Sequence, residues 1–283
     1  MLDNLDHLDN NDRKIVHFLI CIDFLRNSKA QNGTMKNGNM KLFFQILIII
    51  TFVLLGSLIK FFSTKKMHQK IIAIITSYYS IFFLKTFNVK ITHLGCAPAK
   101  SPFLVANHTG TLDILVLSSG LPSRFITSTD TDGDGIAGYI SRAAGCLLVN
   151  RKDRSFREKE IQSISEAIDS SSSIVFFPEG TSTNGETVLP FKAGLMPAVI
   201  KTESQIQAAT IKYKKINGSI IDFKNRDYIY YYGDMKFGAH LKSLTHIKSL
   251  EVEIYWHSPI KTYSTDDPKI LAQKLYDQVI SKF

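Results

Sequence analysis

The stretch that decides the fold is FLVANHTGTLDILVLSS, residues 103–119. Its first five residues have the continuous apolar pattern of a buried strand, and residues 111–119 have the pattern of a helix. Gly110 lies between them, where a glycine allows a sharp turn. A buried strand followed directly by a helix is the building unit of α/β domains with parallel sheets.

The chain continues this alternation from residue 95 to its C-terminus. Further strands are expected at residues 124–128, 146–150, 173–179, 207–213, 227–233 and 249–258, and helices at 156–169, at 192–202 and from Pro268 onward. The sequence therefore predicts an α/β domain with a largely parallel central sheet and flanking helices.

A long apolar run precedes this domain. Residues 42–59 read LFFQILIIITFVLLGSLI, 18 residues in which Gln45 is the only strongly polar side chain. This is about the minimum length of a transmembrane helix, and no signal-peptide cleavage site follows it. A buried core helix is the alternative. More lysines follow the run than precede it, which predicts a single-pass membrane protein with the remaining chain on the cytoplasmic face.

These features divide the chain into four parts. Residues 1–40 are rich in Asp and Asn and are expected to be disordered. Residues 41–62 form the expected transmembrane anchor. Residues 63–94 hold a second apolar stretch, broken by lysines, for which we expect an amphipathic helix in the membrane interface, followed by a linker; a helix packed on the domain is the alternative. Residues 95–283 form the α/β domain.

The charge balance limits the partners. The net charge is +9 and the pI is about 9.3. Such a balance suits nucleic acid, an anionic membrane surface or an anionic substrate. Beside a membrane anchor we expect the last two, and no nucleic-acid partner. The three cysteines are far apart and form no CxxC pair, so neither a disulfide framework nor a zinc site is indicated.

The acidic segment TDTDGDGIAGY, residues 129–139, partly matches two ligand motifs. Its aspartates have EF-hand spacing, but Ser141 occupies the twelfth position, where a bidentate glutamate is needed. Its GxGxxG pattern places aspartates where a pyrophosphate would lie. We therefore expect a solvated acidic turn, with no metal and no nucleotide cofactor.

The first candidate for chemistry is the pair His108 and Asp113. Their spacing alone proves nothing, because His7 and Asp12 have the same spacing in the polar N-terminus. Position distinguishes the two pairs: His108 directly follows a buried strand, at the sheet edge where α/β active sites form. A turn at Gly110 can bring the carboxylate onto one ring nitrogen and leave the other free to accept a proton. The alternative is that Asp113 only caps its helix.

Three further segments follow at successive strand ends. Arg151 ends GCLLVNR, Glu179 lies in FPEGTS, and Lys192 lies in LPFKAG at a helix start. Cations at strand and helix ends suit an anionic substrate. Each segment also has an ordinary interpretation when it is taken alone: Arg151 as part of a surface ion pair, the EGT segment as a turn, and Lys192 as a surface lysine. Their occurrence at successive strand ends is what indicates a site.

In this order the segments resemble the signature of the glycerolipid acyltransferases, the family that includes bacterial 1-acylglycerol-3-phosphate acyltransferase. That signature is NHxxxxD, a glycine-to-arginine strand and FPEGT, and the resemblance covers about residues 95–260. It implies that His108 is the catalytic base and that Asp113 orients it. It also implies a substrate-binding set, in which the arginine and the EGT segment bind the acceptor and its phosphate. The full expected set is Asn107, Arg151, Glu179, Gly180, Thr181 and Lys192.

The function implied by the resemblance is transfer of a fatty acyl group to the hydroxyl of a membrane lysophospholipid. The donor would be an acyl carrier protein thioester or acyl-coenzyme A, and no metal, cofactor or acyl-enzyme is implied. The expected acceptor is 1-acylglycerol-3-phosphate. The YYGDM segment at 231–235 and the Asn184–Gly185 insertion resemble a branch that also contains lyso-ornithine-lipid acyltransferases, and that acceptor is the alternative.

The sequence departs from the family pattern in two places. Ser182 follows Thr181 where many members have arginine, and residues 206–211 lack the prolines of the fourth family motif. Both departures concern the acceptor rather than the base. Two functions of other classes also stay open: a non-catalytic lipid-binding protein on the same fold, and an esterase that uses the same base on water.

Overall fold

The computed structural model describes residues 38–96, 103–128, 136–150, 157–168 and 172–283. The expected N-terminal disorder, the acidic turn at 129–135 and Arg151 lie outside these ranges. Contacts divide the chain into two units, residues 1–41 and 42–283, and the elements below belong to the second unit apart from the first turn of one helix.

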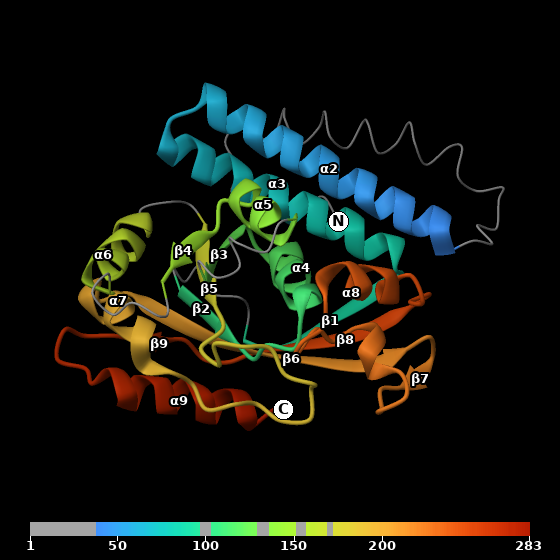
Figure 1. Ribbon diagram of the computed structural model, residues 1–283. Coiled ribbons are helices and arrows are strands. Elements are labelled where there is room, and N and C mark those ends of the chain that lie inside the picture. The colour runs from blue at the N-terminus through green and yellow to red at the C-terminus, as the bar shows by residue number, and fades with distance from the viewer. Residues whose placement is uncertain (1–37, 97–102, 129–135, 151–156, 169–171) are drawn as a thin grey trace. The chain divides into compact units, whose positions relative to one another are not determined.

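Within the described residues the sheet has nine strands, in the order β1-β8-β6-β2-β5-β3-β4, with β7 and β9 paired to β6 (Figure 1). The strands are β1 (Val89–Gly95), β2 (Phe103–Ala106), β3 (Ser123–Ser128), β4 (Leu147–Val149), β5 (Ser173–Phe176), β6 (Gln205–Ile216), β7 (Ser219–Ile220), β8 (Leu250–Trp256) and β9 (Ile260–Lys261). Strands β4, β3, β5, β2 and β6 run parallel, and so do β1 and β8; β6 pairs antiparallel with β8, β7 and β9. The predicted α/β fold with a largely parallel sheet is confirmed.

Helices cover both faces of this sheet. They are α2 (Gly38–Phe62), α3 (Lys65–Thr86), α4 (Thr111–Gly120), α5 (Ile136–Ala143), α6 (Arg157–Ala167), α7 (Met196–Lys201), α8 (Phe237–Leu244) and α9 (Pro268–Ile280), with 3-10 turns η3 (Ala193–Leu195) and η4 (Arg226–Tyr228). Figure 1 shows α3 and α4 above the sheet and α9 below it. The helices and the sheet enclose two clusters of buried apolar residues, one containing Leu117 of α4 and the other containing Leu275 of α9. The sheet's apolar strands are therefore covered on both sides, as a parallel sheet requires.

Helix α3 packs on the domain. Of the two arrangements expected for the apolar stretch within residues 63–94, this is the one observed: Ile72, Phe83 and Leu84 are buried, and the helix contacts α4 and β3. The sheet also begins earlier than expected, because β1 lies within the segment that the sequence assigned to a linker.

Helix α2 covers the segment for which a transmembrane helix was expected. Among the residues that the structure describes, no helix is long and apolar enough to cross a membrane. One face of α2 packs on α3, where the rings of Phe52 and Tyr79 meet edge to face at 5.0 Å. The opposite face is exposed and apolar. Its members recur every four residues: Ile46, Ile50, Leu54 and Leu58.

Residues 227–233 are not a strand, so this prediction was wrong. They contain the end of η4 and then irregular backbone. Ile229 and Tyr230 are both buried, whereas a half-buried strand would alternate. The backbone N–H of Tyr231 donates to the carbonyl of Thr109 at 2.9 Å rather than to a strand ladder. This segment therefore closes against the loop after β2.

Candidate active site

The candidate site lies where parallel strands β2 and β5 end side by side. Val105 of β2 pairs with Phe176 of β5, so Asn107 and His108 emerge beside Phe177 and Glu179. The carboxyl edge of a parallel sheet is where α/β proteins place their ligands, because the following loops converge there. Sheet topology thus brings together two segments that are 71 positions apart, His108 and Glu179.

His108 and Asp113 are in direct contact. The Nδ1 atom of His108 lies 2.9 Å from Oδ2 of Asp113, whose side chain is 0% exposed. The same oxygen accepts the backbone N–H groups of Thr109 at 2.5 Å and of Gly110 at 2.9 Å. Both roles that the sequence left open for Asp113 are therefore observed. Its carboxylate accepts the N–H groups before the first turn of α4, and it contacts the imidazole.

This contact defines the proton positions on the imidazole. An ionised carboxylate only accepts hydrogen bonds, so Nδ1 of His108 carries the proton that faces Asp113. The ring stacks on Phe177, with centroids 3.9 Å apart and planes 10° from parallel. The side chain remains 20% exposed, and Nε2 has no hydrogen-bond partner in the described part of the chain. Nε2 is the basic lone pair available to an incoming group.

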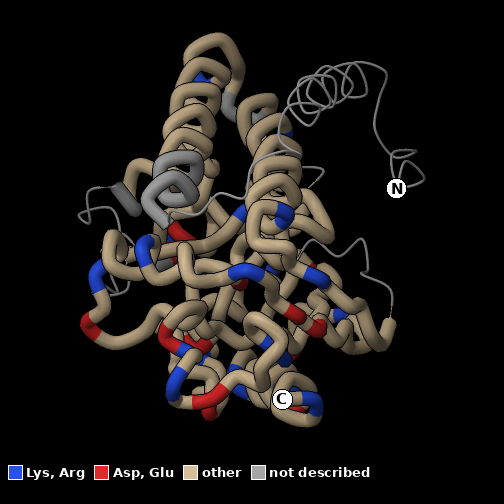
Figure 2. Tube along the Cα trace, turned by 90° about the vertical axis from the view of Figure 1, so that its right-hand side faces the viewer, with Lys and Arg blue, Asp and Glu red and all other residues tan. Residues whose placement is uncertain are grey.

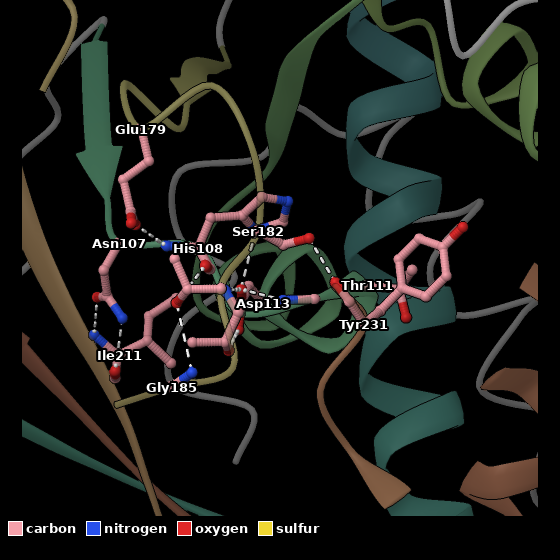
Figure 3. Close-up of polar contacts among 12 residues, drawn as sticks. Asn107, His108, Thr111, Asp113, Glu179, Ser182, Gly185, Ile211 and Tyr231 are labelled. Atoms are coloured by element: carbon pink, nitrogen blue, oxygen red, sulfur yellow. Dashed lines mark hydrogen bonds and ion pairs between the residues drawn. The ribbon is translucent and has the colours of Figure 1, made fainter. Parts of the chain in front are cut away.

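Asn107 binds backbone rather than solvent. Its Nδ2 donates to the carbonyl of Ile211 at 3.0 Å, and its Oδ1 accepts the N–H of Ile211 at 2.8 Å (Figure 3). The residue is buried. The amide continues the hydrogen bonding between β2 and β6 beyond Ala106, the last residue of the ladder. In this structure both polar atoms of the expected substrate-binding residue are used within the fold.

Glu179 is also buried and bridges two loops. One carboxylate oxygen accepts the N–H of His108 at 2.6 Å, and the other accepts the N–H of Leu189 at 2.7 Å. Burial raises the pKa of Glu179 to about 7, although the two N–H donors act in the opposite direction. Its contacts hold the backbone of the candidate base.

Gly180, Thr181 and Lys192 surround the turn after Glu179. Gly180 has φ +75°, a left-handed conformation that favours glycine, and a Cβ there would lie 2.7 Å from Nζ of Lys192. The Lys192 ammonium thus lies over this turn, and the N–H of Lys192 donates to the Pro178 carbonyl. Thr181 is exposed. The structure brings these three together beside Glu179, while Arg151 is outside the described residues.

Sequence reasoning missed several groups that support the site. The Tyr213 hydroxyl of β6 donates to Oδ1 of Asp113 at 2.7 Å. The Ser182 hydroxyl donates to the Tyr231 carbonyl (Figure 3). Thr111 bonds His240 of α8. Burial lowers the pKa of His240 to about 4. The YYGDM segment was the only hint of these contacts, because the partners are 49 to 129 positions apart.

Comparison with known proteins agrees with this geometry. Residues 88–212 match the family described as Acyltransferase. A lyso-ornithine lipid O-acyltransferase from Rhodobacter capsulatus is 31% identical over 174 residues, which cover 60% of this chain and 61% of that protein. A 1-acyl-sn-glycerol-3-phosphate acyltransferase from Neisseria gonorrhoeae is 24% identical over 62% of this chain and 67% of that protein. The similarity to acyltransferases thus covers residues 88–212, and both of these relatives are named as enzymes of that type.

A solved structure supports the fold. The crystal structure of the 1-acyl-sn-glycerophosphate (LPA) acyltransferase PlsC from Thermotoga maritima superposes with a TM-score of 0.55 at 17% identity, covering 86% of this chain and 95% of that one. The sequence relatives carry two different acceptor names, and this chain spans less than two thirds of the Rhodobacter protein's length. The comparisons therefore point to acyl transfer and do not distinguish between the two acceptors.

Proposed function

We propose that this enzyme is a lysolipid O-acyltransferase in which His108 is the general base. The observation that carries the proposal is the contact of Nδ1 with the buried carboxylate of Asp113, which leaves Nε2 basic and accessible. A neutral imidazole held in one tautomer accepts a proton near neutral pH more readily than any other unperturbed side chain.

The reaction then follows from the proton positions. Nε2 of His108 takes the proton of the lysolipid hydroxyl as the oxygen attacks the thioester carbonyl. The new C–O ester bond forms, the C–S bond breaks, and the imidazolium returns the proton to the leaving thiolate. Asp113 stabilises the imidazolium between these steps. This sequence uses no acyl-enzyme and no cofactor, and the acyl donor is an acyl carrier protein thioester or acyl-coenzyme A.

The proposed first acceptor is 1-acylglycerol-3-phosphate. Lys192 lies over the Gly180 turn, next in sequence to Glu179, whose carboxylate bonds the N–H of His108. A phosphate monoester is the headgroup that such a cation suits. By the family resemblance, Arg151 and Thr181 bind the same headgroup. Glu179 and Asn107 would act by holding the backbone of the site, since their polar atoms are bonded within the fold.

A lyso-ornithine lipid is the second candidate acceptor. Ser182 stands where many family members have arginine, and its hydroxyl is engaged by the Tyr231 carbonyl. The loss of a cation weakens the case for a phosphate, and the Rhodobacter relative is named for this acceptor. Competition between the two lysolipids for the purified enzyme, with both products quantified by mass spectrometry, decides between them. A preference for the lyso-ornithine lipid overturns the first choice.

The chemical proposal is tested by His108→Ala. We expect kcat to fall about 100- to 10,000-fold, the usual effect of removing a positioned base, while folding is retained. His7→Ala is the matched control because His7 has the same spacing to an aspartate in the polar N-terminal sequence. Near-normal turnover in His108→Ala contradicts the mechanism. Free fatty acid released without acceptor would instead identify an esterase, and inactivity of the wild type on all thioesters and lysolipids would indicate a non-catalytic lipid-binding protein.

We also propose that the enzyme works at the membrane surface and that the exposed face of α2 contacts lipid. The only charged residues of α2 are Lys41 and Lys60, and Figure 2 shows few charges along the two helices at the top of the molecule. A row of large apolar side chains beside lysines suits an anionic leaflet.

The membrane proposal is tested by introducing a negative charge on the apolar surface of α2. Leu58→Glu should lower the fraction of protein that sediments with anionic vesicles. Ile270→Glu, on α9 across the sheet, is a matched control because the two side chains are 56% and 58% exposed. Equal losses in the two variants, or none in either, contradict a specific role of α2.

A further inference from the structure

The carboxylate of Asp113 is the most heavily hydrogen-bonded group of the site. Oδ2 receives His108 Nδ1 and the N–H groups of Thr109 and Gly110. Oδ1 receives the Thr109 hydroxyl at 3.0 Å and the Tyr213 hydroxyl at 2.7 Å. The carboxylate is therefore satisfied on both oxygens; Oδ2 contacts the imidazole and Oδ1 contacts the Tyr213 hydroxyl.

Tyr213 differs from the other partners of Asp113 in its position in the chain. Thr109 and Gly110 belong to the same short loop as His108 and move with it, whereas Tyr213 is 100 positions from Asp113, on β6. Its ring is buried, and it packs edge to face on Tyr230 with centroids 5.8 Å apart. The register of β6 against β8 shifts between Tyr213 and Lys215. Such irregularities occur often next to active sites, and this one directly follows Tyr213.

We infer that Tyr213 is a positioning residue of the catalytic pair: its hydroxyl holds Oδ1 of Asp113 so that Oδ2 stays aligned with Nδ1 of His108. The inference rests on the proposed role of His108 and adds a residue to it. Burial and the charge of Asp113 raise the pKa of the Tyr213 hydroxyl well above its ordinary value, so it donates across the working pH range.

The inference makes two physical predictions. Without the hydroxyl, the carboxylate loses a charge-assisted donor and can rotate about its last bond, which misaligns the imidazole. The carboxylate is also less neutralised, so its attraction for the protonated imidazole grows and the His108 pKa rises. A purely structural role for the ring predicts neither effect, because phenylalanine keeps the ring.

The test is Tyr213→Phe, with Tyr230→Phe as the matched control. Both changes remove one hydroxyl from neighbouring buried rings, and only the first removes a hydrogen bond to Asp113. We expect kcat of Tyr213→Phe to fall roughly 10-fold with KM within about twofold, as for the loss of one hydrogen bond to a charged group. Tyr230→Phe should stay within about twofold in both constants. Thermal melting checks that both variants are folded.

A second readout observes the imidazole directly. Glu179, with a pKa of about 7, bonds the backbone N–H of His108, so the pH profile of activity alone mixes two groups. Nitrogen-15 NMR of histidine-labelled protein, with the His108 signal assigned by its loss in His108→Ala, separates them. We expect the His108 pKa to rise in Tyr213→Phe, by about half a unit or more, and to stay unchanged in Tyr230→Phe.

A double-mutant cycle with Asp113→Asn shows whether Tyr213 acts through Asp113. In the Asp113→Asn background, Tyr213→Phe should cause little further loss of kcat. The inference is overturned if Tyr213→Phe keeps wild-type kcat and His108 pKa, or if its full loss persists without the carboxylate. These outcomes leave the proposed function intact, whereas full activity of His108→Ala removes that function whatever Tyr213 does.

Discussion

Replacement of Asn107 by alanine should destabilise the domain. The side chain makes two hydrogen bonds to the backbone of Ile211, at 3.0 and 2.8 Å, and all of these atoms are buried. Alanine leaves one N–H and one carbonyl of β6 without a partner at the point where the β2–β6 ladder ends.

The magnitude follows from the two orphaned groups. A buried backbone group that loses its partner costs about 1–3 kcal/mol, so the pair costs about 2–6 kcal/mol. For a domain of this size each 1 kcal/mol lowers Tm by roughly 2–4 °C, which gives a fall on the order of 10 °C. Activity assayed well below Tm should fall less than in His108→Ala, because the base itself is retained.

The assay is thermal melting of the wild type, Asn107→Ala and Asn184→Ala under identical conditions. Asn184 is a partly exposed loop residue whose side chain makes solvent-exposed hydrogen bonds to the carboxylate and the N–H of Glu186, so its replacement should change Tm little. An Asn107→Ala variant that melts within about 2 °C of the wild type refutes the argument that this amide ties β2 to β6.

Three further predictions concern pH and packing. The Glu179 pKa of about 7 lies above that of an unfolded glutamate, so the folded protein keeps a proton that the unfolded chain has released. The Tm advantage of the wild type over Glu179→Gln should therefore shrink as pH rises from about 4.5 to 7. A constant or growing advantage contradicts this. The His240 pKa of about 4 lies below the ordinary value, so the stability it contributes should be lost as pH falls from about 6.5 through 4, and His240→Gln should melt with a weaker acid dependence. Gly110→Ala places a Cβ 2.8 Å from the backbone N of Tyr231 and should cost about 1–3 kcal/mol, seen as a lower urea midpoint; an unchanged midpoint would mean that the two segments separate freely.

The sheet could be predicted because its central strands carry their own signal. β2 and β5 are continuous apolar runs, and buried strands of a parallel sheet look this way whatever their neighbours are. The run DYIYYYG, residues 227–233, has a similar apolar pattern but forms no strand. Its backbone closes on Thr109, and its rings fill the space beside Tyr213, which no local pattern reveals. β1 was missed for the opposite reason, since only two of its seven residues are even half-buried.

In the candidate site too, local contacts could be predicted from the sequence and distant contacts could not. The contact of His108 with Asp113 could be predicted because five residues and one turn contain it. Asn107 and Glu179 were recognised by their motifs, yet their partners are backbone groups of Ile211 and Leu189 that a sequence does not mark. Tyr213 was not recognised at all. Nothing in its neighbourhood distinguishes it from a core tyrosine, and only the pairing of β6 with β2 brings it to Asp113.

These distant contacts have one effect in common. Hydrogen bonds attach the loop from Asn107 to Asp113 to other segments at several points, among them Asn107 to β6 backbone, His108 N–H to Glu179, and Asp113 to Tyr213 of β6. Each attachment fixes a different degree of freedom, namely the start of the loop, the backbone of the base and the rotation of the carboxylate. A base acts efficiently only when its geometry does not have to be found during the reaction. In the proposed mechanism the accessible Nε2 of His108 meets the substrate, and the rigidity of the imidazole comes from residues that the substrate need not touch.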